Sequence, residues 1–176
     1  MSDNEVVVDM IGGLRRPVSL VKADSCVMVV TNRRMIIAQL TSQAMTDMAM
    51  QARERAKSEG KGFFGQWAEQ LKGTFSYAEK YRSMEPSAIM AETSGNFALE
   101  NNDIAQIKIN YKPMRSGGQY QPGEFEIIVD STTGKFNFKT HENDDCIRIL
   151  KQSYGDRVKP PFGYFSSHGV NVRLGI

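Results

Sequence analysis

The chain is poor in the residues that most often carry chemistry. Its 176 residues include two cysteines, two histidines and one tryptophan. No C-x-x-C, H-E-x-x-H or G-x-S-x-G pattern occurs, and the scattered cysteines and histidines have no metal-ligand spacing. These absences argue against a metal centre, a cofactor and a recognised class of catalytic site. A hydrolase without a known motif remains the weakest of three functional hypotheses.

The sequence also lacks a long hydrophobic run and a targeting signal. No apolar run approaches the roughly eighteen residues that a membrane-spanning helix needs. The N-terminus is acidic where a secretory signal would be basic, and Val6–Val8 is too short for the apolar part of one. We therefore expect a cytoplasmic protein in which Cys26 and Cys146 are buried thiols of a reducing compartment, with a single disulfide as the alternative.

Charge of one sign is not in excess either. The net charge is +2, and neither half of the chain carries the basic excess with which proteins displace counterions from nucleic acid. Hydrophobic residues make up 40% and charged residues 24%, as in ordinary globular proteins. The length predicts one domain, residues 1–155, with a helical insertion at 42–82 and a C-terminal tail at 156–176.

The strongest structural signal is Ser25–Leu40. Two short runs rich in β-branched residues, Cys26–Val30 and Met35–Ala38, flank the polar segment Thr31–Arg34, a pattern typical of a β-hairpin. Asn32 is expected to adopt the positive φ of a tight turn. Further strands are expected at Val6–Ile11, which Gly12-Gly13 closes, and at Val18–Lys22, Phe97–Leu99, Ile104–Tyr111, Phe125–Val129 and Lys135–Lys139.

After Leu40 the apolar residues recur with the period of a helix. A first apolar stripe follows Ser42, the predicted N-cap, and a second apolar stripe follows the glycine-rich segment 58–62. Two such helices joined by a glycine-rich turn predict an αα-hairpin. A short helical turn is expected at Pro86, and an exposed loop at Pro113–Gly123. Thr140 is predicted to cap a last helix whose first turn carries Glu142, Asp144 and Asp145 and which Gly155 ends. The stripes of the αα-hairpin comprise Met45, Met48, Ala49, Ala52 and Ala56, then Phe64, Trp67, Ala68, Leu71, Phe75 and Ala78.

Strands followed by one C-terminal amphipathic helix resemble the order of a pleckstrin-homology (PH)-like domain. The hairpin segment Val29–Ile37 resembles the xxxT(N/D)xRxI signature of GRAM and bacterial or archaeal PH-like domains. Pro86–Met90, Asn96 and Asn102–Ile107 are similar to the second half of that family. The resemblance covers about Val18 to Gly155. It implies an α+β, mainly β fold: an antiparallel barrel of about seven strands, capped by the last helix and interrupted by the inserted αα-hairpin.

The segment Gly60–Gly65 matches G-x-G-x-x-G, the pattern of a phosphate-binding loop. A dinucleotide fingerprint requires a buried strand immediately before it, whereas Gln51–Glu59 has the charge of an exposed helix end. The pattern therefore favours a turn between two helices, and no cofactor is expected.

A set of cations forms a candidate anion or lipid rim. Basic residues around the first strands hold inositol phosphates in lipid-binding PH domains, and guanidinium groups suit phosphate. The expected loop between the first strands, Ala23–Ser25, carries an acid instead, so solvated turns are the favoured interpretation. The rim residues are Arg15, Arg16, Lys22, Arg33 and Arg34.

The insertion carries a candidate interaction surface. Its basic and acidic residues are too balanced for strong attraction to anionic lipid, so we rank a protein partner or a homo-oligomer ahead of a membrane. Plain core packing is the alternative for its methionines. The surface comprises Phe63, Phe64, Trp67, Leu71, Phe75, Met45 and Met48.

The first functional hypothesis is thus a non-enzymatic PH-like binding or scaffold module that acts through protein contacts or self-association. The second is a peripheral domain that binds phosphoinositides or other anionic lipids through Arg33, Arg34 and the aromatic helix. The third is the hydrolase.

Overall fold

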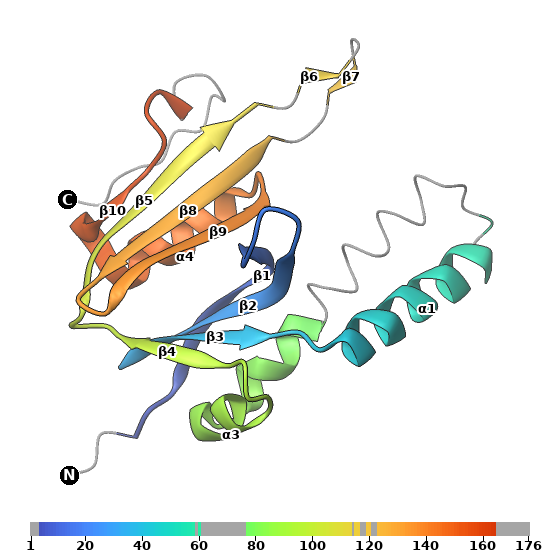
Figure 1. Ribbon diagram of the computed structural model, residues 1–176, viewed down its shortest axis with the longest axis horizontal. Helices are drawn as coiled ribbons and strands as arrows, with labels where there is room; N and C mark the ends of the chain where they lie inside the picture. Colours follow the sequence, from blue (N-terminus) through green and yellow to red (C-terminus); the bar gives the residue numbers. More distant parts are fainter. Residues whose placement is uncertain are drawn as a thin grey trace. The chain divides into compact units, whose positions relative to one another are not determined.

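The structure is a computed structural model, and it describes residues 4–58, 60, 77–113, 115–116, 119–120 and 123–164. The chain divides into two compact units, Met1–Ile104 and Ala105–Ile176. The fold is mainly β, as expected (Figure 1). The side chains of Asp47, Met48, Gln51, Ala52, Arg55 and Ala56 lie outside the description, as do residues 61–76 and therefore most of the expected second helix.

The first unit contains a four-stranded antiparallel meander in the order β1-β2-β3-β4. The central pair confirms the expected hairpin, and β4 lies beside β3. The helical segments of this unit lie between β3 and β4 in the chain. The elements are β1 (Val7–Pro17), β2 (Ala23–Thr31), β3 (Arg34–Gln39), α1 (Ser42–Ser58), η1 (Lys80–Ser83), α3 (Pro86–Ala91) and β4 (Phe97–Glu100).

One expected break and one expected strand are wrong. Gly12-Gly13 does not end a strand: β1 runs through it with a register shift between Ile11 and Leu14, where Gly13 adopts a φ of 70° that suits glycine. Val18–Lys22 is a connecting loop, and Ala23–Ser25 belongs to β2. The reason is the pairing of Pro17 with Ala23, which leaves the residues between them to make the turn.

The core of the first unit lies where η1 and α3 pack on one face of the meander. Val29 and Ile36 are paired across the hairpin and are fully buried, and Tyr81 from η1 and Ile89 from α3 join them. Met45 of α1 is partly buried against the same cluster and Ala78 belongs to it, so two of the expected stripe residues serve the core. The full cluster is Met10, Val27, Val29, Ile36, Ala38, Leu40, Ala78, Tyr81 and Ile89.

The second unit contains the strand order β10-β5-β8-β9. Phe125, Ile127 and Val129 alternate along β8 as buried residues, and β8 pairs with β9 across the expected turn. Helix α4 runs alongside these strands (Figure 1) and buries Cys146, Ile147, Ile149, Leu150 and Tyr154. The elements are β5 (Ile104–Lys112), β6 (Arg115–Ser116), β7 (Gln119–Tyr120), β8 (Glu124–Ser131), β9 (Gly134–His141), α4 (Asp144–Tyr154), η2 (Gly155–Arg157) and β10 (Val158–Lys159).

The structure contains short strands that were not expected, in the Pro113–Gly123 loop and in the C-terminal tail. Within Pro113–Gly123, β6 and β7 form a short antiparallel ladder. In the tail, Val158 of β10 pairs in parallel with Ile107 of β5, and Tyr164 is 3% exposed. The tail is therefore held at Val158 and Tyr164, whereas Phe162 between them is fully exposed, and residues 165–176 lie outside the description.

Both expected helix caps are displaced. Thr41, not Ser42, caps α1, since its Oγ1 accepts a hydrogen bond from the amide of Ala44 (3.1 Å). Thr140 is a buried residue of β9, and Asn143 caps α4 by accepting from the amide of Asp145 (2.9 Å). The acidic first turn and the end of α4 at Gly155, which has a φ of 55°, are confirmed.

The two cysteines are free thiols and both are buried. Burial raises the pKa of Cys26 to about 12; the nearby Arg16 lowers this pKa, and Asp24 raises it by a smaller amount. Burial alone raises the pKa of Cys146 to about 12. Neither side chain exposes more than 1% of its surface. The expectation of buried thiols is confirmed for this structure.

We predict that both thiols resist alkylation in the folded chain, because a buried thiol with a raised pKa supplies little reactive thiolate. Iodoacetamide at mildly alkaline pH, followed by mass measurement, should modify neither cysteine in the native protein and both in denaturant. Rapid modification of either cysteine before unfolding would contradict their burial.

We also predict that the Asn96 side chain stabilises the fold, because it joins the end of α3 to β3. Its Oδ1 accepts from the amide of Gln39 (2.7 Å) and from Thr93 Oγ1 (2.7 Å), and its Nδ2 donates to the carbonyl of Ile89 (2.6 Å). Asn96→Ala should lower the free energy of unfolding by about 1–3 kcal/mol, because three polar groups lose their partner. Asn102→Ala, at an exposed turn, is the control and should change it by at most about 0.5 kcal/mol in a denaturant titration.

Candidate functional site

The tip of the β2–β3 hairpin is closed by Thr31. Its Oγ1 accepts hydrogen bonds from the amides of Arg33 (3.1 Å) and Arg34 (2.9 Å) and lies 2.8 Å from Glu5 Oε1, to which it donates. The expectation that Asn32 has a positive φ is wrong, since none of the described non-glycine residues does. The turn is instead stabilised by the Thr31 hydroxyl, which accepts the two backbone amides that follow it.

Two asparagines attach neighbouring segments to this tip. Asn32 accepts from the amide of Val6 (2.9 Å) and donates to the carbonyl of Asn4 (3.3 Å). On the other side, Asn101 donates from its amide nitrogen to the carbonyl of Arg33 (2.8 Å) and from Nδ2 to that of Thr31 (3.1 Å). The Thr-Asn pair of the signature therefore has a structural role here.

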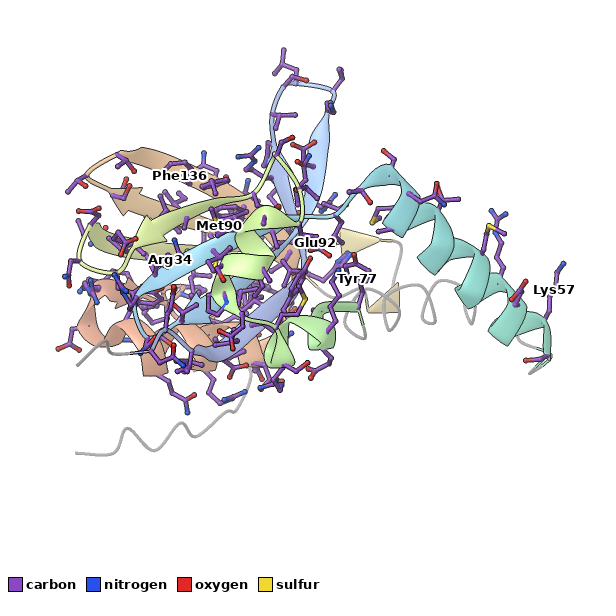
Figure 2. The ribbon with its side chains drawn as sticks, turned by 90° about the horizontal axis from the view of Figure 1, so that it is seen from below. Arg34, Lys57, Tyr77, Met90, Glu92 and Phe136 are labelled. Atoms are coloured by element: carbon purple, nitrogen blue, oxygen red, sulfur yellow. The ribbon has the colours of Figure 1, made fainter. Side chains whose placement is uncertain are left out.

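The Arg34 side chain, labelled in Figure 2, is part of the same arrangement. Its Nε donates to Glu5 Oε1 at 2.9 Å, and the two side chains are only 24% and 15% exposed. A guanidinium held by a carboxylate in this way is neutralised locally. Arg34 is thus engaged within the protein, whereas Arg33 is exposed.

The five expected rim residues are not brought together. Arg15 is paired with Ser25 at one end of β2, and Arg33 follows Thr31 at the other end. Six residues of an extended strand separate Ser25 from Thr31, so the two groups of cations lie roughly 20 Å apart. Arg15, Arg16 and Lys22 surround the β1–β2 loop, and Arg33 and Arg34 are at the opposite end of the hairpin.

Arg16 is fixed at the base of the β1–β2 loop. Its Nη2 lies 3.4 Å from Asp24 Oδ2, and its guanidinium stacks 5.0 Å from the ring centre of Phe97. The Arg16 and Asp24 side chains are 28% and 13% exposed. Arg15 and Lys22 are exposed on either side of the loop. The base of the loop is therefore rigid and carries three cations against one carboxylate.

Four of the five backbone amides of the β1–β2 loop, Val18–Lys22, donate hydrogen bonds within the loop. The amides of Val18 and Ser19 donate to the carbonyl of Lys22 at 2.9 and 3.1 Å. Ser19 Oγ accepts from the amides of Val21 (3.4 Å) and Lys22 (3.1 Å). The preceding Pro17 has no amide hydrogen. The loop is a self-contained turn that does not depend on water for these groups.

The tip of this loop exposes aliphatic side chains. Leu20 is 105% exposed, Val21 is 97% exposed and Val18 is 45% exposed. Burying a side chain of this size stabilises a protein by about 1.5–3 kcal/mol, and neither Leu20 nor Val21 contributes that stabilisation to the fold. An apolar tip on a rigid hairpin with a cationic base is the best candidate contact site among the described residues.

Sequence reasoning missed this site because Val18–Lys22 contains three apolar residues in five and was predicted to be a strand. The signal that could have found it is the pair Pro17 and Ser19, which favour a turn, together with a length too short for a buried strand.

The aromatic surface expected from the insertion cannot be compared with the structure. Phe63, Phe64, Trp67, Leu71 and Phe75 lie outside the described residues, and so does the side chain of Met48. The G-x-G-x-x-G segment is described only at Gly60, which has a φ of 64° and follows α1 by a turn.

A polar cluster joins the start of η1 to the end of α3. Lys80 Nζ donates to Tyr77 OH (2.6 Å) and to Glu92, while Tyr81 OH donates to the other Glu92 oxygen (2.7 Å). The ammonium lies 4.0 Å from the centre of the Tyr77 ring. Burial opposes the charge of Lys80, but the bonds to Glu92 and Tyr77 outweigh it and raise its pKa. Figure 2 labels Tyr77, which precedes η1, and Glu92, which follows α3. The cluster therefore ties the end of the insertion to the end of α3.

A second cluster fixes the tail in the second unit. Glu142 Oε2 accepts from Tyr111 OH (3.1 Å) and the amide of Gly123 (2.9 Å), and its Oε1 accepts from Tyr164 OH (2.8 Å). Tyr164 OH also lies 3.0 Å from Asp144 Oδ1. The rings of Tyr111, Phe125 and Tyr164 pack edge to face. Glu142 therefore precedes α4 and binds three segments, instead of sitting in the first turn of the helix as expected.

Within the part of the chain that is described, no three His, Cys, Asp or Glu side chains gather as metal ligands. No described helix is both long enough and apolar enough to cross a bilayer.

No protein-family model and no curated protein matches the chain. Two solved structures are similar to it, each with a TM-score of 0.40 and 10% identity. One is the C-terminal domain of an unknown protein from Leishmania infantum, with 85% of this chain and 84% of that chain covered. The other is the hSac2 domain of the human phosphoinositide phosphatase Sac2, with 92% and 78% covered.

The two clusters generate a prediction about alkaline pH. Burial first, and hydrogen bonding to carboxylates second, raises the pKa of Tyr81 and of Tyr164, and burial raises that of Tyr154. The unfolded chain releases these protons near pH 10 (about the ordinary tyrosine pKa), so the stability that these hydroxyls contribute is complete below that pH and falls as the pH rises above it.

Tyrosinate absorbance should therefore show that these three of the six tyrosines ionise only as the protein unfolds. Tyr164→Phe should lower the free energy of unfolding at neutral pH by about 1–3 kcal/mol, because the partly buried Glu142 carboxylate loses a donor. The free energy of unfolding should also depend less steeply on pH above pH 10. Simultaneous ionisation of all six tyrosines in the folded chain would show that these hydroxyls are not held as described.

Proposed function

We propose that the chain is a non-enzymatic, PH-like binding module that attaches to another macromolecular surface through its β1–β2 loop. In this proposal the fold is a variant of the PH-like class, with α4 as its C-terminal helix and the helical insertion as an added arm. The antiparallel meander, the braced Thr31–Arg34 tip and the C-terminal amphipathic helix support this interpretation.

The observation that carries the proposal is the exposure of Leu20 and Val21. Both are at the end of a hairpin whose base is fixed by the Arg16–Asp24 pair, and both are almost completely exposed. Aliphatic side chains in such a place contribute nothing to the core, so contact with a partner is the role that gives them favourable free energy.

The polar side chains of the described clusters support a non-enzymatic role. Glu5, Glu92 and Glu142 each bind two or more groups that hold strands, helices or the tail in place. Carboxylates that are saturated by structural donors are poorly suited to move protons in a reaction.

Contacts made by the insertion, with a protein partner or a second copy, remain a separate prediction, because its aromatic residues lie outside the described part. A cytoplasmic location also belongs to the proposal.

The proposal predicts that the loop determines whether the chain is free or attached to a larger assembly in the cell. In an extract, the wild-type chain should migrate in complexes or with a particulate fraction, and Leu20→Ser/Val21→Ser should shift it toward the free 19.7 kDa chain. The substitutions replace exposed side chains, so the thermal midpoint should stay unchanged.

Val8→Ser is the matched control. Val8 is also an exposed aliphatic residue of this unit, at 52%, but it lies at the end of β1 far from the loop. If wild type, control and loop variant all migrate as the free chain, the loop is not an attachment site and the proposed function is wrong.

A further inference from the structure

We propose that the second unit contains a preformed binding site for a phenol group, and that the tail residue Tyr164 is a detachable occupant that keeps this site closed. The ligand class is an aromatic ring that carries a hydroxyl group. The site is independent of the proposed function, which rests on a loop of the first unit. We call its four walls the phenol site: Tyr111, Phe125, Glu142 and Asp144.

The acceptor of the phenol site is held in place by residues outside the tail. Glu142 and Gly123 are joined in both directions: the Glu142 amide donates to the Gly123 carbonyl (2.8 Å), and the Gly123 amide donates to Glu142 Oε2 (2.9 Å). Tyr111 OH donates to the same oxygen (3.1 Å). The carboxylate is therefore oriented by bonds that Tyr164 does not make.

The aromatic walls are also positioned without the tail. The Tyr111 ring lies against Gly123, where a Cβ atom would come within 2.2 Å of it, so glycine leaves the room that this ring needs. The same ring packs 5.9 Å from the ring of Phe125, which is fully buried. A site that is ordered in advance binds its guest without a further loss of conformational freedom.

The phenol site matches a ring with a hydroxyl group. Tyr164 meets the Tyr111 and Phe125 rings edge to face, at centroid distances of 5.1 and 5.3 Å. Its hydroxyl lies 2.8 Å from Glu142 Oε1 and 3.0 Å from Asp144 Oδ1. Aromatic contacts favour any ring, whereas a partly buried carboxylate favours a ring that donates a hydrogen bond. The site should therefore prefer a phenol to a plain aromatic of similar size.

The segment that carries Tyr164 is attached at few points. β10 pairs with β5 over two residues, and of residues 159–163 only Pro161 is buried. Tyr164 ends a turn by donating from its amide to the Pro161 carbonyl (3.3 Å), and Gly163 within this turn has a φ of 71°. Few buried contacts and few backbone hydrogen bonds to other elements are typical of a segment that opens before the whole protein unfolds.

A tethered occupant excludes a free ligand through its effective concentration. A group on a short linker behaves as if it were present at millimolar concentration or above. A phenol of about eight non-hydrogen atoms should have a dissociation constant on the order of 1 mM in such a site. Tyr164 therefore keeps small phenols out at low concentration, and a phenolic ligand that makes further contacts can displace it.

Vacating the site in the full chain tests the proposal. In Tyr164→Ala, p-cresol, which has the shape of the tyrosine side chain, should bind with a dissociation constant on the order of 1 mM and raise the thermal midpoint. Toluene, the same molecule without the hydroxyl, should bind about fivefold to a hundredfold more weakly. The wild type should bind p-cresol at least about tenfold more weakly than the variant, because Tyr164 occupies its site.

Three results of this titration would overturn the proposal. They are no binding of p-cresol by Tyr164→Ala, equal binding of p-cresol and toluene by that variant, and equal binding of p-cresol by the variant and the wild type.

Tyr154→Ala is the matched control. Tyr154 is a second buried tyrosine of the same unit, in α4, with its ring centre 5.4 Å from the Arg157 guanidinium. The substitution removes the same atoms at another place, so p-cresol should have no advantage over toluene. An equal preference for p-cresol in both variants would mean that any space left by a tyrosine selects phenols, and the assigned site would be wrong.

Hydrogen exchange of the wild type tests whether the occupant detaches. The amides of Val158 and Tyr164 donate to the carbonyls of Gly155 and Pro161, so their exchange reports opening of the tail. Both should exchange at least about a hundredfold faster than the slowest amides of β8 and β9. Tyr164→Phe keeps the ring and should accelerate their exchange by about fivefold to a hundredfold.

This second measurement stands even if Tyr164→Ala does not fold. Exchange of the tail amides at the rate of the central strands would show that Tyr164 is an integral part of the core. A rate that Tyr164→Phe leaves unchanged would show that its hydroxyl does not hold the tail. Either result would overturn the detachable occupant.

Discussion

The first unit depends on one strand that is buried on both faces. Every residue of β2 from Cys26 to Thr31 is buried, with β1 paired on one side and β3 on the other. Side chains alternate across a strand, so consecutive burial requires apolar partners above and below the sheet as well as at its edges. A slip of one residue would exchange the two faces, and so β2 fixes the register of β1 and β3, and through β3 that of β4.

Burial of this kind leaves polar backbone groups to be satisfied where the strands end. Thr31 does this at the tip of the hairpin, Asn101 ties β4's end to the same tip, and Asn96 joins β3 to α3. A buried amide or carbonyl without a partner would cost about 1–3 kcal/mol, comparable to a sizeable part of the total stability of a domain. The polar residues of the hairpin signature therefore have a structural explanation, and no ligand is needed to account for them.

The two ends of β2 are accordingly different. At the Thr31 end, hydrogen bonds and the Glu5–Arg34 pair attach two neighbouring segments, so the cations there are engaged or face solvent beside a closed turn. At the Ala23 end, the turn bonds only to itself, and its aliphatic side chains extend beyond the part of the sheet that other elements cover. The residues exposed at this tip are not those that maintain the fold, so the proposed attachment through the loop would not weaken the core.

The local character of most elements could be read from the sequence. Runs with β-branched residues identified β2, β3, β5 and β8, and the turn at Ser131–Gly134 identified β9. A helical period with proline at its start or glycine at its end identified α3 and α4. These features act between neighbours in the chain, so periodicity and turn chemistry suffice. The predicted N-caps of the two helices were one and three residues away from the observed ones. Thr41 and Ser42 are chemically alike, and Thr140 is buried within β9, so it does not cap α4.

What only the tertiary structure decided is the fate of Val18–Lys22 and the role of Glu142. An apolar five-residue run can be a strand or a bare loop, and the choice depends on the pairing of Pro17 with Ala23, which is set by the burial of β2. Glu142 binds Tyr111, Gly123 and Tyr164, residues distant in the chain from one another. The sequence by itself determined most of the longer strands and helices, since those preferences are local, but not the short pairs β6–β7 and β10–β5. Which side chains remain uncovered depends on contacts between distant segments, and the candidate site consists of such uncovered side chains.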